Sequence, residues 1–121
     1  MIIKKLQDVP FSEIPDHKGV KKQIVLGPAD GSNEIILRYF SVAVGEKSPH
    51  HSHDFPHLVR IEAGSGELVD ESGAAKPLIK GDYVFIGDNE VHHLKNTGNE
   101  PFDFICVIPR RGEAGCFTEC R

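Results

Sequence analysis

Residues 45–64 read GEKSPHHSHDFPHLVRIEAG, with His51 and His53 one residue apart and His57 four residues further on. Side chains two residues apart on an extended strand project from the same face, so the first two imidazoles are spaced to bind one ion. The third keeps the same parity if the strand continues. Alternatively, the intervening aspartate and proline make a turn that brings it back on the next strand. Because imidazole is the commonest metal-ligating side chain, the stretch predicts a metal site.

A second informative stretch, residues 81–96, reads GDYVFIGDNEVHHLKN. His92 follows a turn here and begins a new segment, so it becomes a fourth ligand only if the fold brings two distant strands together. A single histidine near a turn is usually a solvated polar residue. On that ground His17, His50 and His93 receive no functional role.

Both stretches resemble the conserved motifs of the cupin superfamily. The first has the spacing of the first cupin motif and reads Gly45-x5-His51-x-His53-x3-His57-x6-Gly64. Histidine stands at position 57 where the family usually has glutamate. The second resembles the second motif and reads Gly81-x5-Gly87-x-Asn89-x2-His92-x3-Asn96, with Gly87 and Asn89 in place of the usual proline and glycine. The chain is similar to small single-domain bacterial cupins with a four-histidine site.

This resemblance implies an all-β fold, an antiparallel double-stranded β-helix or jelly-roll barrel. One cupin domain would span residues 1–121, with residues 110–121 as a C-terminal tail. The resemblance also implies a homodimer, often formed through N-terminal strands. It implies that the metal is held inside the barrel by four ligands: His51, His53, His57 and His92.

The histidine at position 57 changes the charge of the expected site. Three imidazoles and a carboxylate leave a divalent ion with about one net positive charge, whereas four neutral imidazoles leave about two. We therefore expect stronger attraction of anionic ligands. Imidazole suits manganese, iron, nickel, copper and zinc alike, so the divalent transition metal is not identified. Zinc closed in by all four rings would instead be structural.

The pocket walls are expected from strand alternation. Phe40 and Arg38 share one face of the strand predicted at 34–44, and Phe104 and Cys106 share one face of the strand at 102–108. An inward Arg38 would anchor a substrate carboxylate, but the same side chain could equally point outward. Arg is rarely buried without a partner. Tyr39 lies on the opposite face, and Arg60 is assigned to a dimer surface.

Two functions remain open at this point. The first is a metal-dependent enzyme acting on a small anionic or enolisable molecule, with dioxygenases placed first by the resemblance, then isomerases, lyases and decarboxylases. The second is a non-catalytic small-molecule-binding or sensor protein with a structural metal. A fold and a metal site do not specify a reaction.

Composition and charge argue against several other classes of protein. The 121 residues carry a net charge of -4 and no basic run, which argues against nucleic-acid binding. No segment approaches the ~18 apolar residues of a membrane span, and no signal-peptide core is recognisable, so a cytoplasmic protein is expected.

Of three cysteines, Cys116 and Cys120 lie in the tail, and their role stays open. Helical periodicity is absent, and strands are predicted at 23–26, 34–44, 58–63, 67–70, 83–86 and 102–108.

Overall fold

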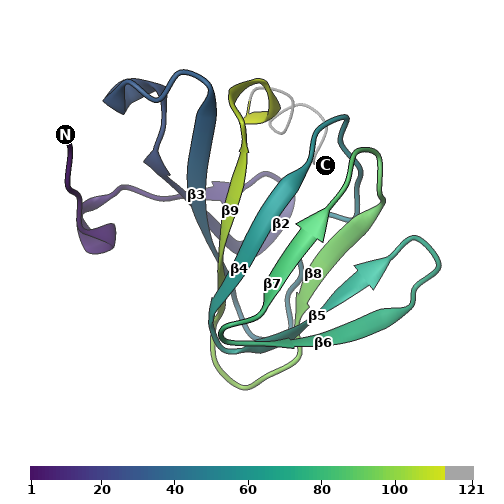
Figure 1. Ribbon diagram of the computed structural model, residues 1–121. Helices are drawn as coiled ribbons and strands as arrows, with labels where there is room; N and C mark the ends of the chain where they lie inside the picture. The colour runs from purple at the N-terminus through teal and green to yellow at the C-terminus, as the bar shows by residue number, and fades with distance from the viewer. Residues whose placement is uncertain (114–121) are drawn as a thin grey trace.

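The computed structural model describes residues 1–113 and confirms the all-β architecture (Figure 1). Two short 3-10 helices, η1 (Leu6–Asp8) and η2 (Pro28–Asp30), accompany the strands. The strands are β1 (Ser12–Ile14), β2 (His17–Leu26), β3 (Ile35–Val42), β4 (His57–Ala63), β5 (Ser65–Asp70), β6 (Ala75–Ile79), β7 (Tyr83–Ile86), β8 (His92–Asn96) and β9 (Phe102–Pro109). None of the helices among these residues is long and apolar enough to cross a membrane.

The strands form two antiparallel sheets that face each other. The larger sheet has the order β1-β2-β3-β9-β4-β7, and the smaller has the order β6-β5-β8. Strands far apart in sequence therefore lie side by side, as Figure 1 shows for β3, β9 and β4. The C-terminal strand β9 lies in the middle of the larger sheet, between β3 and β4. This arrangement is the jelly-roll barrel that the motifs predicted.

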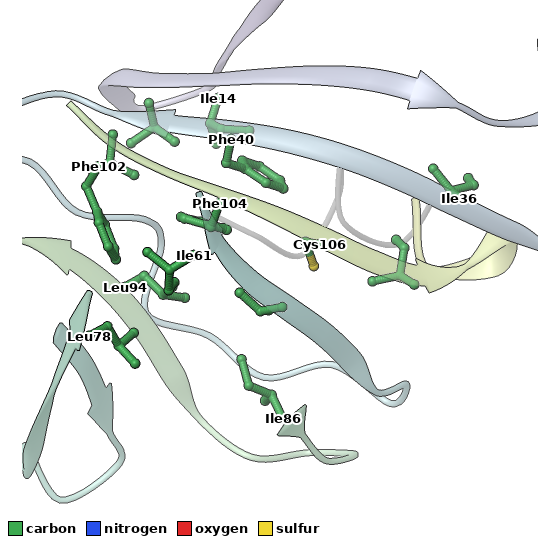
Figure 2. Close-up of a cluster of buried hydrophobic side chains, with 14 of the residues drawn as sticks. Ile14, Ile36, Phe40, Ile61, Leu78, Ile86, Leu94, Phe102, Phe104 and Cys106 are labelled. Carbon is green, nitrogen blue, oxygen red and sulfur yellow. The ribbon is translucent and has the colours of Figure 1, made fainter. Parts of the chain in front are cut away.

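Alternation along β3 and β9 decides which side chains enter the barrel. Every second residue of both strands is buried, and the register pairs Arg38 with Cys106 and Phe40 with Phe104. The two phenylalanine rings stack with centroids 5.2 Å apart. Figure 2 shows Phe40, Phe104 and Cys106 together with Ile61, Leu78 and Leu94 in the space between the sheets. The hydrophobic core therefore occupies the barrel interior. The four predicted pocket residues, Arg38, Phe40, Phe104 and Cys106, lie on the same inner face of the larger sheet.

Three strands were not predicted, and each has a physical reason. β8 reads HHLKN and has little β propensity, so the sequence pattern does not indicate a strand there. β6 contains Pro77, which usually argues against a strand; it lies at the edge of the smaller sheet, where a missing amide donor is tolerated. β1 has only three residues. β2 is longer than predicted because polar side chains dominate residues 17–22.

Several motif residues have structural roles rather than chemical ones. Asn89 adopts φ 62°, the left-handed region that the family's usual glycine occupies easily and asparagine tolerates. Its amide donates to the carbonyl oxygen of His53 at 2.5 Å. Asn96 is buried, and its side-chain amide donates to the carbonyl oxygens of Val42 and Glu100. The departure at position 89 therefore leaves the turn intact and ties it to the histidine segment.

Candidate metal centre

Three separate segments bring the four predicted ligands together. His51 and His92 form a two-residue antiparallel bridge, with amide-to-carbonyl distances of 3.1 and 2.9 Å. His92 begins β8 and His57 begins β4, so the smaller and larger sheets each contribute one ligand. His51 and His53 lie in the connection between β3 and β4. The strand expected to carry His51 and His53 is not formed: this connection has only isolated bridges, at Lys47 and His51, and the turn before His57 places that residue on a new strand.

The ring spacing of the cluster fits a shared ion. Ring centroids lie 4.2 Å apart for His51 and His53, 5.1 Å for His53 and His57, 5.2 Å for His57 and His92, and 6.4 Å for His53 and His92. Imidazoles that share an ion at about 2.1 Å from each nitrogen have centroids roughly 4.5 Å apart at a right angle and roughly 6.5 Å apart when opposite. Residues 1–113 nonetheless contain no three His, Cys, Asp or Glu side chains already arranged as a finished ion site. The structure therefore supports a metal site through the spacing of the four imidazole rings, and not through ligand atoms already arranged around one position.

Burial keeps the cluster uncharged. Desolvation, followed by the charges of neighbouring imidazoles and of Arg38, lowers the pKa of His51 to about 2. Desolvation is also the largest cause for His53, whose pKa falls to about 4, and for His57, whose pKa falls to about 3. The pKa of His92 is lowered for the same reason. Near neutral pH the cluster presents neutral imidazoles, the form that binds metal ions.

Hydrogen bonds define the orientation of part of the cluster. The Nδ1 of His92 lies 2.8 Å from the carbonyl oxygen of Glu90. A carbonyl only accepts, so Nδ1 carries the proton and Nε2 keeps its lone pair; metal-binding histidines typically donate the other ring N–H to a carbonyl in this way. The Nδ1 of His57 is buried and has no hydrogen-bond partner within the described part of the chain. A buried polar nitrogen left in this state is destabilising unless a ligand satisfies it.

The lowered pKa values predict an acid-sensitive fold for the metal-free protein. A histidine in the unfolded chain has a pKa of about 6.5, so below that pH the unfolded state binds protons that the folded state does not. Stability should therefore be complete above about pH 6.5 and be lost as the pH falls toward 4. We expect the free energy of unfolding, measured with urea, to fall by roughly 1 kcal/mol per clustered histidine between pH 6 and 5. A free energy that does not change over this interval would contradict the assigned burial.

A small cavity lies beside the histidines. Its volume is about 50 Å³, and its walls include all four histidines together with Arg38, Phe40, Phe104 and Cys106. Drug-sized ligands occupy pockets of about 300–1,000 Å³, so this space fits an ion and one or two small ligands. All four pocket candidates predicted from strand alternation thus line the space next to the candidate ligands.

The structure places the Arg38 side chain inside the barrel and not on its outer face. Its side chain is 2% exposed, and its Nη2 lies 3.3 Å from the Cys106 sulfur. Tyr39 points to the other face, where its hydroxyl donates to Asp103 at 2.7 Å. Arg60 also lies on the outer face and pairs with Glu62. Alternation was therefore a reliable guide on these strands.

Some site residues were missed. The Phe55 ring is 2% exposed and stacks on His53, with centroids 4.6 Å apart. Lys22 is also 2% exposed and pairs with Glu113, a contact across 91 residues that no local pattern signals. His50 and His93, which had no assigned role, contact each other through their Nδ1 atoms at 2.5 Å. Cys116 and Cys120 lie outside the described residues.

Comparison with known proteins agrees with this fold. A polyketide cyclase, RemF from Streptomyces resistomycificus, is 26% identical with a TM-score of 0.83, covering 90% of this chain and 79% of that one. A predicted oxalate decarboxylase from Thermotoga maritima is 22% identical with a TM-score of 0.76, covering 90% and 99%. A sugar phosphate isomerase of the cupin superfamily from Silicibacter pomeroyi is 23% identical with a TM-score of 0.72, covering 88% and 74%. The last two likenesses establish the fold alone.

No curated protein matches the chain. The family described as the cupin domain matches residues 38–108, a range that contains both histidine stretches and the strands that carry the pocket residues. More than half of the chain falls within this match. The chain therefore belongs to the cupin domain family.

Proposed function

We propose that this protein holds one divalent transition-metal ion through His51, His53, His57 and His92. The observation that carries the proposal is the convergence of four neutral imidazoles, from three segments, on the wall of one cavity. The hydrogen bond from His92 to Glu90 and the unsatisfied Nδ1 of His57 also support it. Manganese, iron, nickel, copper and zinc all suit such a donor set.

We further propose that the site is that of an enzyme for a small anionic or enolisable molecule, dioxygenase-like chemistry being the first class to test. When bound, the ion supplies Lewis-acid polarisation of a ligand oxygen and, for redox metals, electron transfer. Arg38 places a positive charge on the cavity wall and would orient an anionic group. The Phe40 ring, whose centroid lies 5.0 Å from the Arg38 guanidinium carbon, and the Phe104 ring make the neighbouring part of the wall apolar and would exclude water from it. The polyketide cyclase is the relative whose identity, at 26%, makes an enzymatic role worth testing.

One observation favours the second candidate, a binding or sensor protein with a structural metal. A cavity of about 50 Å³ leaves little room for a substrate beside an ion. Oxygen consumption by protein loaded with iron or manganese, assayed with diketones, catechols and keto acids, separates the two candidates. Turnover that disappears in His53→Ala supports the enzyme. No turnover with any of these compounds, together with full metal loading, supports the binding protein.

We also propose a homodimer formed through the outer face of the larger sheet. Phe85, Leu58, Val107 and Leu37 are register neighbours across four strands and form an apolar row; Phe85 is 68% and Leu58 55% exposed. Contiguous apolar surface of this kind usually marks an interface. The neighbouring pair of Arg60 and Glu62 carries both signs of charge, so the face is compatible with a second copy of itself across a two-fold axis.

Light scattering during gel filtration tests the dimer. The native chain is expected at twice the monomer mass, and Leu58→Glu with Phe85→Glu is expected at the monomer mass, because two charges would be buried at the interface. Ile79→Glu is the matched control: Ile79 is 62% exposed but lies on the smaller sheet. A native chain that stays monomeric at tens of micromolar would contradict the proposal.

A further inference from the structure

A second cavity lies at the seam between the two sheets. Its volume is about 240 Å³, and its walls come from β5, β6 and their turn, from β7, and from the loop between β7 and β8. β6 and β7 are edge strands of the two separate sheets. We refer to this space as the seam cavity. It is large enough for a small organic molecule, since a cavity of ~150 Å³ holds a benzene ring.

Two residues are shared by the walls of both cavities. Ile86 and His92 line the seam cavity and also line the cavity beside the histidines. A side chain that borders two spaces lies between them, so these two residues form a partition. Ile86 ends β7, is 4% exposed and is one of the buried core side chains in Figure 2. Because His92 is a candidate ligand, Ile86 is the part of the partition whose size can change without loss of the donor set.

Charged residues form part of the wall of the seam cavity, namely Asp70, Lys76 and Glu90. The Oδ1 of Asp70 accepts from two backbone amides of the following turn, at 2.9 and 3.0 Å. The Oε2 of Glu90 accepts from the Gly87 amide at 2.5 Å. These bonds orient both carboxylates and leave capacity for further donors, because an ionised carboxylate has about four acceptor sites. An uncharged molecule with hydroxyl groups suits this wall, whereas an anion would meet two carboxylates and one ammonium.

We propose that the seam cavity is the entrance to the histidine cavity and the outer half of its ligand site, with Ile86 as the partition and an uncharged, hydroxyl-bearing molecule as the ligand. Together the two cavities approach the lower end of the range for small-molecule pockets, about 300 Å³. A substrate then need not fit beside the ion within the inner cavity of about 50 Å³. The ligand class deepens the proposed function, rests on it for the chemistry at the ion, and favours an enolisable ligand over an anionic one.

Passage through the seam cavity can be measured at Cys106, a wall residue of the inner cavity that is 3% exposed. The probe is 2-hydroxyethyl methanethiosulfonate, which is uncharged and carries a hydroxyl group. The Cys106 thiolate attacks its sulfenyl sulfur, forms a mixed disulfide and releases methanesulfinate. Mass spectrometry of the peptide that contains Cys106 follows the rate in the full chain. Chelator is present throughout, so the rate does not depend on metal binding.

Two substitutions should change this rate in opposite directions. Ile86→Ala opens the partition and should speed labelling about tenfold. Ile61→Ala is its matched control, because Ile61 is also buried but is not a wall residue of either cavity in the described part of the chain. Ala74→Trp fills the seam cavity from its exposed rim and should slow labelling about tenfold. Ala75→Trp should not, because residue 75 lines a different cavity on the other face of the smaller sheet.

The ligand class is tested by the charge of the reagent. The anionic 2-sulfonatoethyl reagent should label Cys106 about threefold more slowly than the probe, once each rate is divided by its rate with free cysteine. One excess negative charge at about 6 Å in water has an effect of roughly this size. Glu90→Gln should remove most of the difference. Glu71→Gln is the matched control, at an exposed carboxylate in the turn between β5 and β6, and should leave the difference unchanged.

The proposal has clear contrary results. Labelling rates that respond to neither Ile86→Ala nor Ala74→Trp would show that small molecules reach Cys106 by another route. If alanine at position 86 prevents folding, Ile86→Val takes its place, and no labelling of Cys106 in either the native chain or that variant would overturn the entrance. Equal normalised rates for the two reagents would overturn the ligand class. A chain that binds no metal but shows the expected rates would refute the metal site alone.

Discussion

Replacing His53 and His57 together by alanine is expected to abolish divalent metal binding, from about one ion per chain to none after dialysis. The two residues supply half of the proposed ligands, and their rings lie 5.1 Å apart within the cluster. Loss of a supporting outer-shell contact alone weakens metal sites by about 10–100-fold, so loss of two ligands should exceed about a hundredfold. Metal analysis after equilibrium dialysis against manganese, iron or zinc measures the change.

His17→Ala with His50→Ala is the matched control for that double substitution. It also removes two imidazoles, but neither is among the four that line the cavity. We expect it to keep the metal content of the native chain. A double substitution at 53 and 57 that retained a full ion, with normal folding by circular dichroism, would show that the ion is bound elsewhere.

A second large effect is expected from Gly64→Ala, at the end of the first motif. Gly64 has φ +77°, and an added Cβ would overlap the backbone carbonyl oxygen of Pro101. The left-handed conformation costs about 1–2 kcal/mol for alanine, and displacing backbone in a packed core costs about 1–3 kcal/mol more. We expect a loss of roughly 2–5 kcal/mol in the free energy of unfolding, a large share of a typical domain's stability.

Gly45→Ala separates these two contributions. Gly45, at the start of the same motif, has φ +81°, but nothing lies within 4 Å of an added Cβ. Only the conformational part, about 1–2 kcal/mol, should be lost there. Urea denaturation of both variants gives the comparison. Equal losses at the two positions would mean that the close approach to Pro101 is relaxed at little cost.

Much of this fold could be predicted because its signals are local. Spacing between glycines and histidines identified the two motifs, and alternation on β3 and β9 placed Arg38, Phe40, Phe104 and Cys106 on the inside, where they lie. The chemistry of the donor set was also visible in the order of the histidines. Their pairwise distances required the sheet topology, since His51 meets His92 across forty residues of chain.

The rest of the site depends on contacts that no short pattern encodes. Lys22 looked like one more polar residue in a lysine-rich stretch, yet it is buried because a carboxylate from the far end of the chain reaches it. Phe55 sits in an irregular connection, where neither period 2 nor period 3.6 applies. Residues 110–113 were assigned to a tail because they follow the last apolar run, although polar contacts hold them against the barrel.

The most direct test of the metal site is a crystal structure of protein loaded with one metal, with anomalous data collected above and below its absorption edge. We predict a single anomalous peak inside the barrel, at about 2.0–2.3 Å from one nitrogen of each of His51, His53, His57 and His92. An anomalous map with no peak among these four rings, or a peak held by other side chains, would contradict the account.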